Sequence, residues 1–171
     1  MIDIGEDLVG AYLSKVVGCP IVQFNVRTGI NQGEIDVVGL KLLDAQVCEV
    51  WLCEVSTHTS GLGGYKGDAA GKIATKIASV KQFAEVTYAG VPAHIEVWSP
   101  KVGPRMLTKL DAVWDEHPDA HLVANHEYAA RVRLLSGLAR VQSAYSDSPS
   151  FRLLQILSRL PSNPLEHDAA Q

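Results

Sequence analysis

Cysteine is scarce in this sequence. The 171 residues contain three cysteines, Cys19, Cys48 and Cys53, and no two of them form a CxxC pair. An odd number of spaced cysteines neither completes a disulfide framework nor supplies the paired thiolates of a structural zinc site. We therefore expect reduced, buried thiols in a protein that folds around an ordinary hydrophobic core.

Signals for export, membrane insertion and phosphate-loop nucleotide binding are also missing. The first seven residues are acidic rather than basic, and no apolar run reaches the roughly 20 residues that a membrane-spanning helix needs. The glycine-rich segment 59–67 is not followed by Gly-Lys-Ser/Thr at the spacing of a P-loop. We expect a cytoplasmic protein that has no membrane partner.

Positive charge is not in excess either. The formal net charge is −4 at pH 7, so nucleic-acid binding has no general support from composition and needs a local basic patch. Hydrophobic residues make up 47% of the chain, which is typical of a folded globular protein and excludes a disordered one.

Two adjacent strands carry the most informative residues. Residues 33–39 and 50–58 alternate or run apolar, and the break near Asp44 and Ala45 predicts an antiparallel pair. Each strand carries one acid, Asp36 or Glu54, where a strand normally buries an apolar side chain. A carboxylate in such a place is costly unless it is hydrogen-bonded, ion-paired or bound to a metal. The pair therefore indicates a divalent-cation site.

The remaining pattern predicts helices and strands on both sides of this pair. We expect a helix at 3–17, a strand at 21–27, a helix at 68–86, a strand at 93–99, a helix at 105–116 and a short strand at 120–124. Two further helices, 126–144 and 151–160, follow, and residues 161–171 are expected to be disordered. This divides the chain into a core domain (1–125), a C-terminal helical extension (126–160) and a tail (161–171).

Four short segments stand in a distinctive order on these elements. They are Gly5-Glu6 with Ala11-Tyr12-Leu13, Asn25-Val26-Arg27, Gly33-Glu34-Ile35-Asp36 and Glu54-Val55. In this order they resemble the PD-(D/E)XK nuclease superfamily, and within it the small branch likened to Holliday-junction resolvases, over about residues 3–100. The resemblance implies the restriction endonuclease-like α/β fold. That fold has an αβββαβ core with a mixed central sheet flanked by helices, to which this chain adds C-terminal helices.

The resemblance also implies a site. Asp36 and Glu54 would hold Mg²⁺, or Mn²⁺ in its place, together with the main-chain carbonyl of Val55, and Glu6 would assist through a water or a second ion. Mg²⁺ suits such oxygen ligands, because it is usually held by one or two carboxylates plus substrate phosphate. A bound ion of this kind activates a water for attack on a phosphodiester. The implied substrate is DNA, and many members of the superfamily work as homodimers.

The chain departs from the family pattern at Ser56. The family places a lysine two residues after the second acid, and a neutral hydroxyl supplies no positive charge there. Loss of one such charged donor typically costs on the order of 10²–10³ in rate. Some members provide the lysine from the following helix, which makes Lys76 the first candidate because it lies nearest the buried stripe. Lys72 is the second candidate and His58 the third.

Each candidate also has an ordinary structural interpretation. Asp3 and Glu6 have the spacing of a helix capping box, which explains Glu6 as well as catalysis does. Asp36 fits a strand-end carboxylate bonded to a turn, whereas Glu54 is harder to explain among its apolar neighbours. Lysines on a helix edge usually cover apolar surface with their stems.

Three hypotheses follow. The first is a Mg²⁺-dependent DNA endonuclease with Asp36 and Glu54 as metal ligands. The second keeps the fold without catalysis, as a module that binds nucleic acid or a protein through the arginines of the C-terminal helices. The third is an unrelated α/β domain in which both acids are structural.

Overall fold

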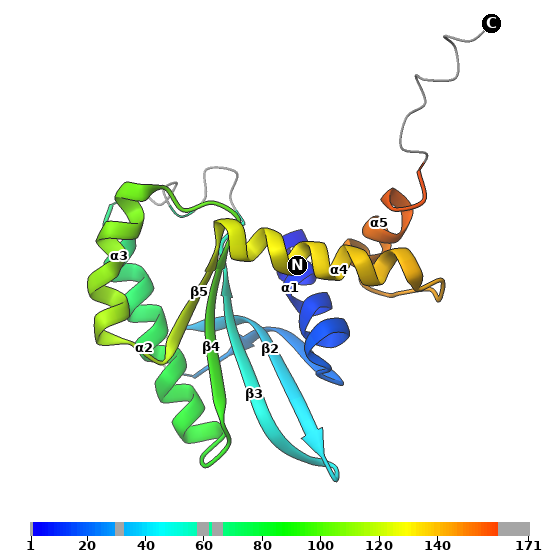
Figure 1. Cartoon of the computed structure of the whole chain (residues 1–171). Helices are drawn as coiled ribbons and strands as arrows, with labels where there is room; N and C mark the ends of the chain where they lie inside the picture. The colour runs from blue at the N-terminus through cyan, green and yellow to red at the C-terminus, as the bar shows by residue number, and fades with distance from the viewer. Residues whose placement is uncertain (1, 30–32, 58–61, 63–66, 161–171) are drawn as a thin grey trace, which may run out of the picture.

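The computed structural model describes residues 2–29, 33–57, 62 and 67–160. These residues form three layers, with a β-sheet between two groups of helices (Figure 1). Within them, no helix is long and apolar enough to cross a membrane. The predicted tail, residues 161–171, lies outside the described residues.

The middle layer is a five-stranded mixed sheet with the strand order β1-β2-β3-β4-β5. The first three strands are antiparallel, and β3, β4 and β5 are parallel. Asp44 and Ala45 connect β2 to β3 with φ angles of 50° and 64°, as in a type I′ turn, whose twist matches that of a strand pair. The predicted antiparallel pair is therefore confirmed. The strands are β1 (Ile21–Arg27), β2 (Glu34–Leu43), β3 (Gln46–Val55), β4 (Ala93–Ser99) and β5 (Ala120–Ala124).

Helices cover both faces of this sheet. Helices α2 (Ala69–Thr87) and α3 (Pro104–Glu116) are the crossovers between the parallel strands, and they pack on one face. Helices α1 (Ile4–Tyr12) and α4 (Asn125–Val141) pack on the other face. Helix α5 (Pro149–Leu157) packs against α1 and α4. Figure 1 shows the two groups on opposite sides of the strands.

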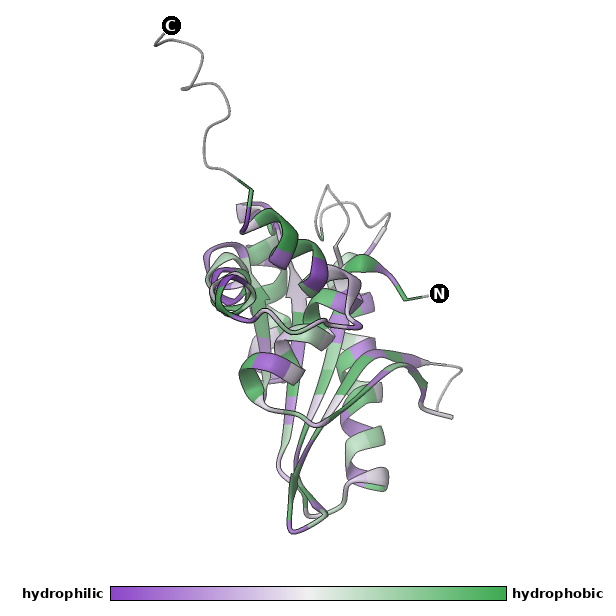
Figure 2. Cartoon of the chain, turned by 90° about the vertical axis from the view of Figure 1, so that its right-hand side faces the viewer, coloured by the Kyte–Doolittle hydropathy of each residue, from purple (hydrophilic) through white to green (hydrophobic). Residues whose placement is uncertain are grey.

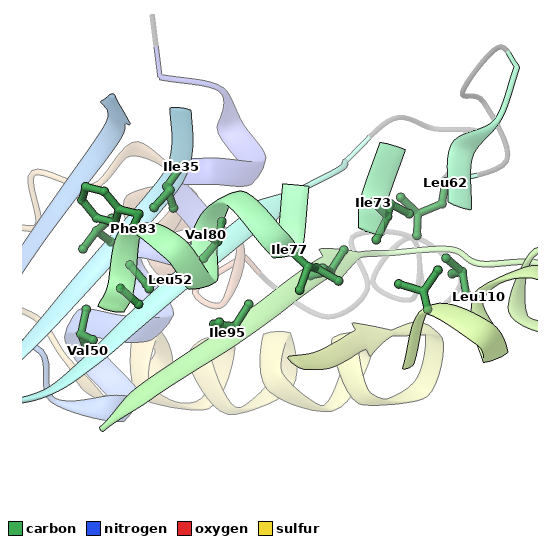
Figure 3. Packing of buried hydrophobic residues seen from close by; sticks show 14 of the residues in the cluster. Ile35, Val50, Leu52, Leu62, Ile73, Ile77, Val80, Phe83, Ile95 and Leu110 are labelled. Carbon is green, nitrogen blue, oxygen red and sulfur yellow. The ribbon is translucent and has the colours of Figure 1, made fainter. Parts of the chain in front are cut away.

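The core between α2 and the sheet follows from the spacing of apolar residues along the helix. Figure 3 shows side chains of α2 turned towards residues of the strands, Leu52 and Ile95 among them. Figure 2 shows hydrophobic and hydrophilic segments alternating along the helices, as amphipathic elements require. The helical spacing of the sequence predicts a buried stripe of Ile73, Ile77, Val80 and Ala84. All four are buried, and Ala69 and Phe83 are buried in addition.

The elements agree with the sequence prediction in kind and order, and they differ at their ends. An α/β fold with a mixed sheet flanked by helices is confirmed, including the short strand β5. The first helix does not continue regularly to residue 17, because Leu13–Val17 forms a π-helical turn, η1, before Gly18. Strand β3 ends at Val55 instead of residue 58, and His58 lies outside the described residues. Helices α4 and α5 begin and end one to three residues earlier than predicted.

A buried ion pair fastens α4 to the sheet. Arg131 Nη1 donates to both carboxylate oxygens of Glu96 on β4 at 2.9 Å, and its Nη2 donates to Glu127 at 2.8 Å. The guanidinium lies over the rings of Trp98 and Tyr12, at 4.8 and 5.3 Å from their centroids. Trp98 Nε1 donates to Glu96 as well, at 2.8 Å. This cluster joins the predicted C-terminal extension to the core sheet.

Replacing Arg131 should therefore destabilise the whole fold. Arg131→Ala leaves the buried Glu96 carboxylate without its cation, and breaking one partner of a buried pair typically costs about 3–5 kcal/mol in the free energy of unfolding. The matched control is the exposed Arg133 two residues along the same helix. Arg133→Ala should change stability by about 0.5 kcal/mol or less. Urea unfolding followed by circular dichroism measures both, and equal stability of the two variants would contradict the assigned anchor.

Candidate functional site

The two strand acids meet at one end of the β2–β3 pair. Val37 pairs with Cys53 and Val38 with Leu52, so the same register continued by one residue sets Asp36 opposite Glu54. Directly opposed residues of an antiparallel pair share a face of the sheet. Both side chains are buried, with 9% of Asp36 and 4% of Glu54 exposed. The sequence-predicted acids are thus brought together on the face that α2 covers.

Asp36 is hydrogen-bonded to the neighbouring strand rather than to a turn. Its Oδ2 accepts from the main-chain N–H of Val55 at 2.6 Å. The next N–H, of Ser56, points the opposite way and donates to the carbonyl of Trp98 on β4 at 2.8 Å. In an extended strand the N–H and C=O of one residue project to the same side. The Val55 carbonyl therefore also projects to the Asp36 side, as the predicted ligand set requires.

Lys76 reaches this site from α2. The helix begins after Asp68, whose side chain accepts from Gly71 N–H, and Ile73 and Ile77 turn its inner face to the core. Lys76 stands next to Ile77 on the edge of that face, and its Nζ forms an ion pair with Glu54 Oε2. Its side chain keeps 47% of its surface exposed, against 5% for Glu54. The long stem thus delivers a solvated charge to a buried acid.

Burial dominates the electrostatics of both acids. The pKa of Glu54 is raised to about 7, chiefly by desolvation; Lys76 acts to lower it, and the nearby negative charge of Asp36 acts to raise it. Desolvation also raises the pKa of Asp36, while Lys76 and the Val55 N–H act to lower it. Glu34 adds negative charge that raises the pKa of both carboxyls, a contribution the sequence analysis missed. Desolvation and the neighbouring negative charges therefore outweigh the lowering effect of Lys76 on the pKa of both carboxyls.

A small pocket lies beside the Lys76–Glu54 pair. Its volume is about 20 Å³, which is room for a single water molecule. Ser56 is 5% exposed, and its Oγ is buried without a hydrogen-bond partner among the described residues. The sequence did not predict this unsatisfied hydroxyl, because it does not show which hydrogen-bond partners lie within reach of a buried side chain. The pocket is lined by Glu54, Val55, Ser56, Leu62, Ile73, Lys76 and Val97.

Glu6 is part of the helix capping box that its spacing predicts. Its carboxylate accepts from Asp3 N–H at 3.0 Å, which completes a capping box at the start of α1. It also accepts from Asn25 Nδ2 at 3.4 Å, and its charge raises the pKa of Asp36. A Cβ at Gly5 would collide with the side chain of Thr57, so glycine there lets α1 approach the end of β3. Glu6 is therefore a cap that also stands near the acid pair.

The other residues singled out from the sequence contribute less to this site. Lys72 lines an open groove at the start of α2, which Lys76 shares, but it does not line the small pocket. His58 lies outside the described residues. Asn25, which belongs to one of the segments behind the family resemblance, donates a hydrogen bond to Glu6. Its φ of 53° is a backbone conformation that asparagine tolerates better than most residues.

The donor set fits a hard divalent cation. Two carboxylates and a main-chain oxygen on adjacent strand ends are the kind of ligands that Mg²⁺ accepts while keeping several waters. Among the described residues, no group of three or more histidine, cysteine, aspartate or glutamate side chains could hold a metal ion. Softer metals that need several thiolate or imidazole ligands therefore find no matching set in this part of the chain.

Removing the Glu54 charge should stabilise the fold at high pH. The folded state raises the pKa of this group from 4.5 to about 7, so it holds a proton that the unfolded chain releases. The free energy of unfolding is therefore highest below pH 4.5 and falls as the pH rises through 7, by roughly 3 kcal/mol in all. Glu54→Gln avoids this loss. Its melting temperature at pH 8 in EDTA should exceed that of wild type by roughly 5–10 °C.

Two comparisons control this prediction. At pH 5 Glu54→Gln and wild type should melt within a few degrees of each other, because the folded protein is already protonated there. Glu49 lies on the same strand, partly exposed, and its pairing with Lys41 lowers its pKa. Glu49→Gln should therefore lose stability at pH 8. A Glu54→Gln protein less stable than wild type at pH 8 would contradict the assigned desolvation.

Comparison with known proteins adds no relative to this description: no family model, no curated protein and no solved structure matches the chain.

Proposed function

We propose that this protein is a Mg²⁺-dependent DNA endonuclease of the restriction endonuclease-like type. Asp36, Glu54 and the Val55 carbonyl are its metal ligands, and Lys76 is its catalytic lysine. The observation that carries the proposal is the buried acid pair on adjacent strands with an ammonium group from the following helix against one acid. The sheet with its crossover helix is compatible with that fold.

The chemistry divides between the ion and the chain. A bound divalent cation supplies a nucleophilic water at neutral pH and offsets charge on the departing oxygen. Asp36 and Glu54 hold their oxygens at one strand end, where burial strengthens their interaction with a cation. Lys76 supplies the positive charge that Ser56 lacks, from a stem exposed enough to meet a phosphate. The same oxygen ligands can bind Mn²⁺ in place of Mg²⁺.

Cleavage should require both the cation and the acid pair. We expect wild type to cut branched, single-stranded or duplex DNA with Mg²⁺ and to stop cutting in EDTA. Asp36→Asn should reduce the rate at least about 100-fold, because it weakens the charge that holds the ion. Glu49→Gln is the control, since Glu49 lies on the strand that carries Glu54 and is bonded to Lys41 and His94. Equal cleavage by wild type and Asp36→Asn, or none by either, would remove the enzymatic proposal.

The two lysines of α2 should differ in their contribution to rate. At saturating Mg²⁺, Lys76→Met should lower kcat by on the order of 10²–10³, as expected for loss of a charged donor to the transition state. Lys72→Met should change kcat by only a fewfold, because Lys72 lies one turn away and does not line the pocket beside Glu54. Single-turnover kinetics on labelled DNA separates the two. A larger loss from Lys72→Met would reassign the catalytic lysine.

A second candidate function is DNA binding without cleavage. It is favoured by the exposed Arg133 and Arg140 on α4 and the exposed Arg159 just after α5, whereas Arg131 is committed to Glu96. Binding through these groups would release counterions and weaken steeply with added salt. Such binding in a protein that cuts no DNA would support this function over the first.

A further inference from the structure

Two features of the acid pair are left unexplained by its role as a metal site. The Lys76 ammonium already stands on Glu54, in the place that a cation would need. Ser56 lines the pocket beside this ion pair, and its hydroxyl is buried without a partner among the described residues. A buried hydroxyl without a hydrogen bond is costly and calls for a specific explanation.

A divalent cation and the Lys76 ammonium compete for the same charge. Lys76 lowers the pKa of Asp36 and of Glu54, so it is the cation that both carboxylates feel in this structure. Two positive charges on one carboxylate oxygen repel each other strongly at a buried site. Binding of Mg²⁺ to Glu54 therefore requires the ammonium to withdraw.

The pocket offers the withdrawn ammonium a place. Glu54, Ser56 and Lys76 all line it, and its volume of about 20 Å³ admits a group the size of a water molecule or an ammonium. Ser56 Oγ is an acceptor there, and a lysine has three donors to offer it. The Lys76 side chain is half exposed, so its stem can change rotamer without repacking the core.

We propose that Lys76 has two positions, on Glu54 when no cation is bound and on Ser56 Oγ when a divalent cation occupies the acid pair. This inference rests on the metal site of the proposed function. It gives Ser56 a role as the positioning residue for Lys76. It also makes the ion pair an intrinsic competitor of the cation.

A double-mutant cycle on cation affinity tests the exchange without reference to cleavage. Isothermal titration with MgCl₂, repeated with MnCl₂, compares wild type, Lys76→Met, Ser56→Ala and the double variant. We expect Lys76→Met to bind the cation about tenfold more tightly, since its competitor is gone. Ser56→Ala should bind it roughly fivefold more weakly, because the displaced ammonium loses its acceptor. In the Lys76→Met background Ser56→Ala should have no effect.

Three controls make the result specific. Lys76→Arg keeps the charge and should bind cations as weakly as wild type, and Lys72→Met should leave affinity unchanged. Circular dichroism melting verifies that each variant is folded, and Lys76→Gln replaces Lys76→Met if the latter is not. The proposal is overturned if loss of Lys76 leaves affinity equal or weaker, or if Ser56→Ala has the same effect in both backgrounds.

The outcome is separable from the nuclease proposal. Cation exchange in proteins that cut no DNA would uphold the two-position lysine and remove the nuclease. Mg²⁺-dependent cleavage in which Lys76 and Ser56 do not affect cation affinity would do the reverse. No cation binding by any variant would overturn the inference and the metal site together.

Discussion

The desolvation of two carboxylates at one strand end is the constraint on which the site depends. The β2–β3 register places Asp36 and Glu54 on one face, and α2 buries that face with Ile73 and Ile77. The same helix carries the positive charge that pairs with the buried carboxylates, because Lys76 stands at the edge of its apolar stripe and forms an ion pair with Glu54. Core and site are thus two consequences of one helix packing on one sheet.

The opposite face of the sheet also buries a carboxylate, but this carboxylate is neutralised by a different kind of cation. Glu96 pairs in register with Cys53, one residue before Glu54, and is buried under α4 instead of α2. Its cation is Arg131, which binds both of its oxygens, bonds a second acid and stacks on two aromatic rings. The planar guanidinium of Arg131 is held by several hydrogen bonds and two aromatic rings, so it is pre-organised and resists displacement.

The contrast with Lys76 is informative. Lys76 contacts Glu54 through a compact ammonium on a mobile stem, with nearly half its side chain in solvent, whereas the Arg131 side chain is 16% exposed. The chemistry of the two cations suits them to different tasks: a guanidinium for a permanent joint, an ammonium for an exchangeable contact. The sheet therefore carries a structural acid on one face and the proposed metal-binding pair on the other.

Local pattern predicted the elements well, because alternation and helical periodicity are local properties. The Asp44-Ala45 break follows from local turn chemistry, and the α2 stripe follows from helical periodicity. The position of Lys76 beside that stripe agrees with its ion pair to Glu54, while its catalytic role stays a prediction. Long-range contacts were beyond such reasoning. The partner of Asp36 is a main-chain N–H on another strand, and Arg131 was assigned to a binding surface although it is bound to Glu96. Both contacts join residues that lie far apart in the sequence, so local patterns do not reveal them.

The acid pair is hard to justify on stability alone. A glutamine at position 54 would keep the shape of the side chain and avoid the loss of stability that burial of a charge brings at neutral pH. The buried Ser56 hydroxyl, which has no hydrogen-bond partner among the described residues, is a second unfavourable group at the same pocket. Two unfavourable groups side by side, each of which a neutral or apolar residue would relieve, are more typical of a functional site than of a purely structural one. A cation at Asp36 and Glu54 would offset the negative charge, and the ammonium it displaces would satisfy the hydroxyl. Under the proposed cation exchange, one binding event would account for both groups.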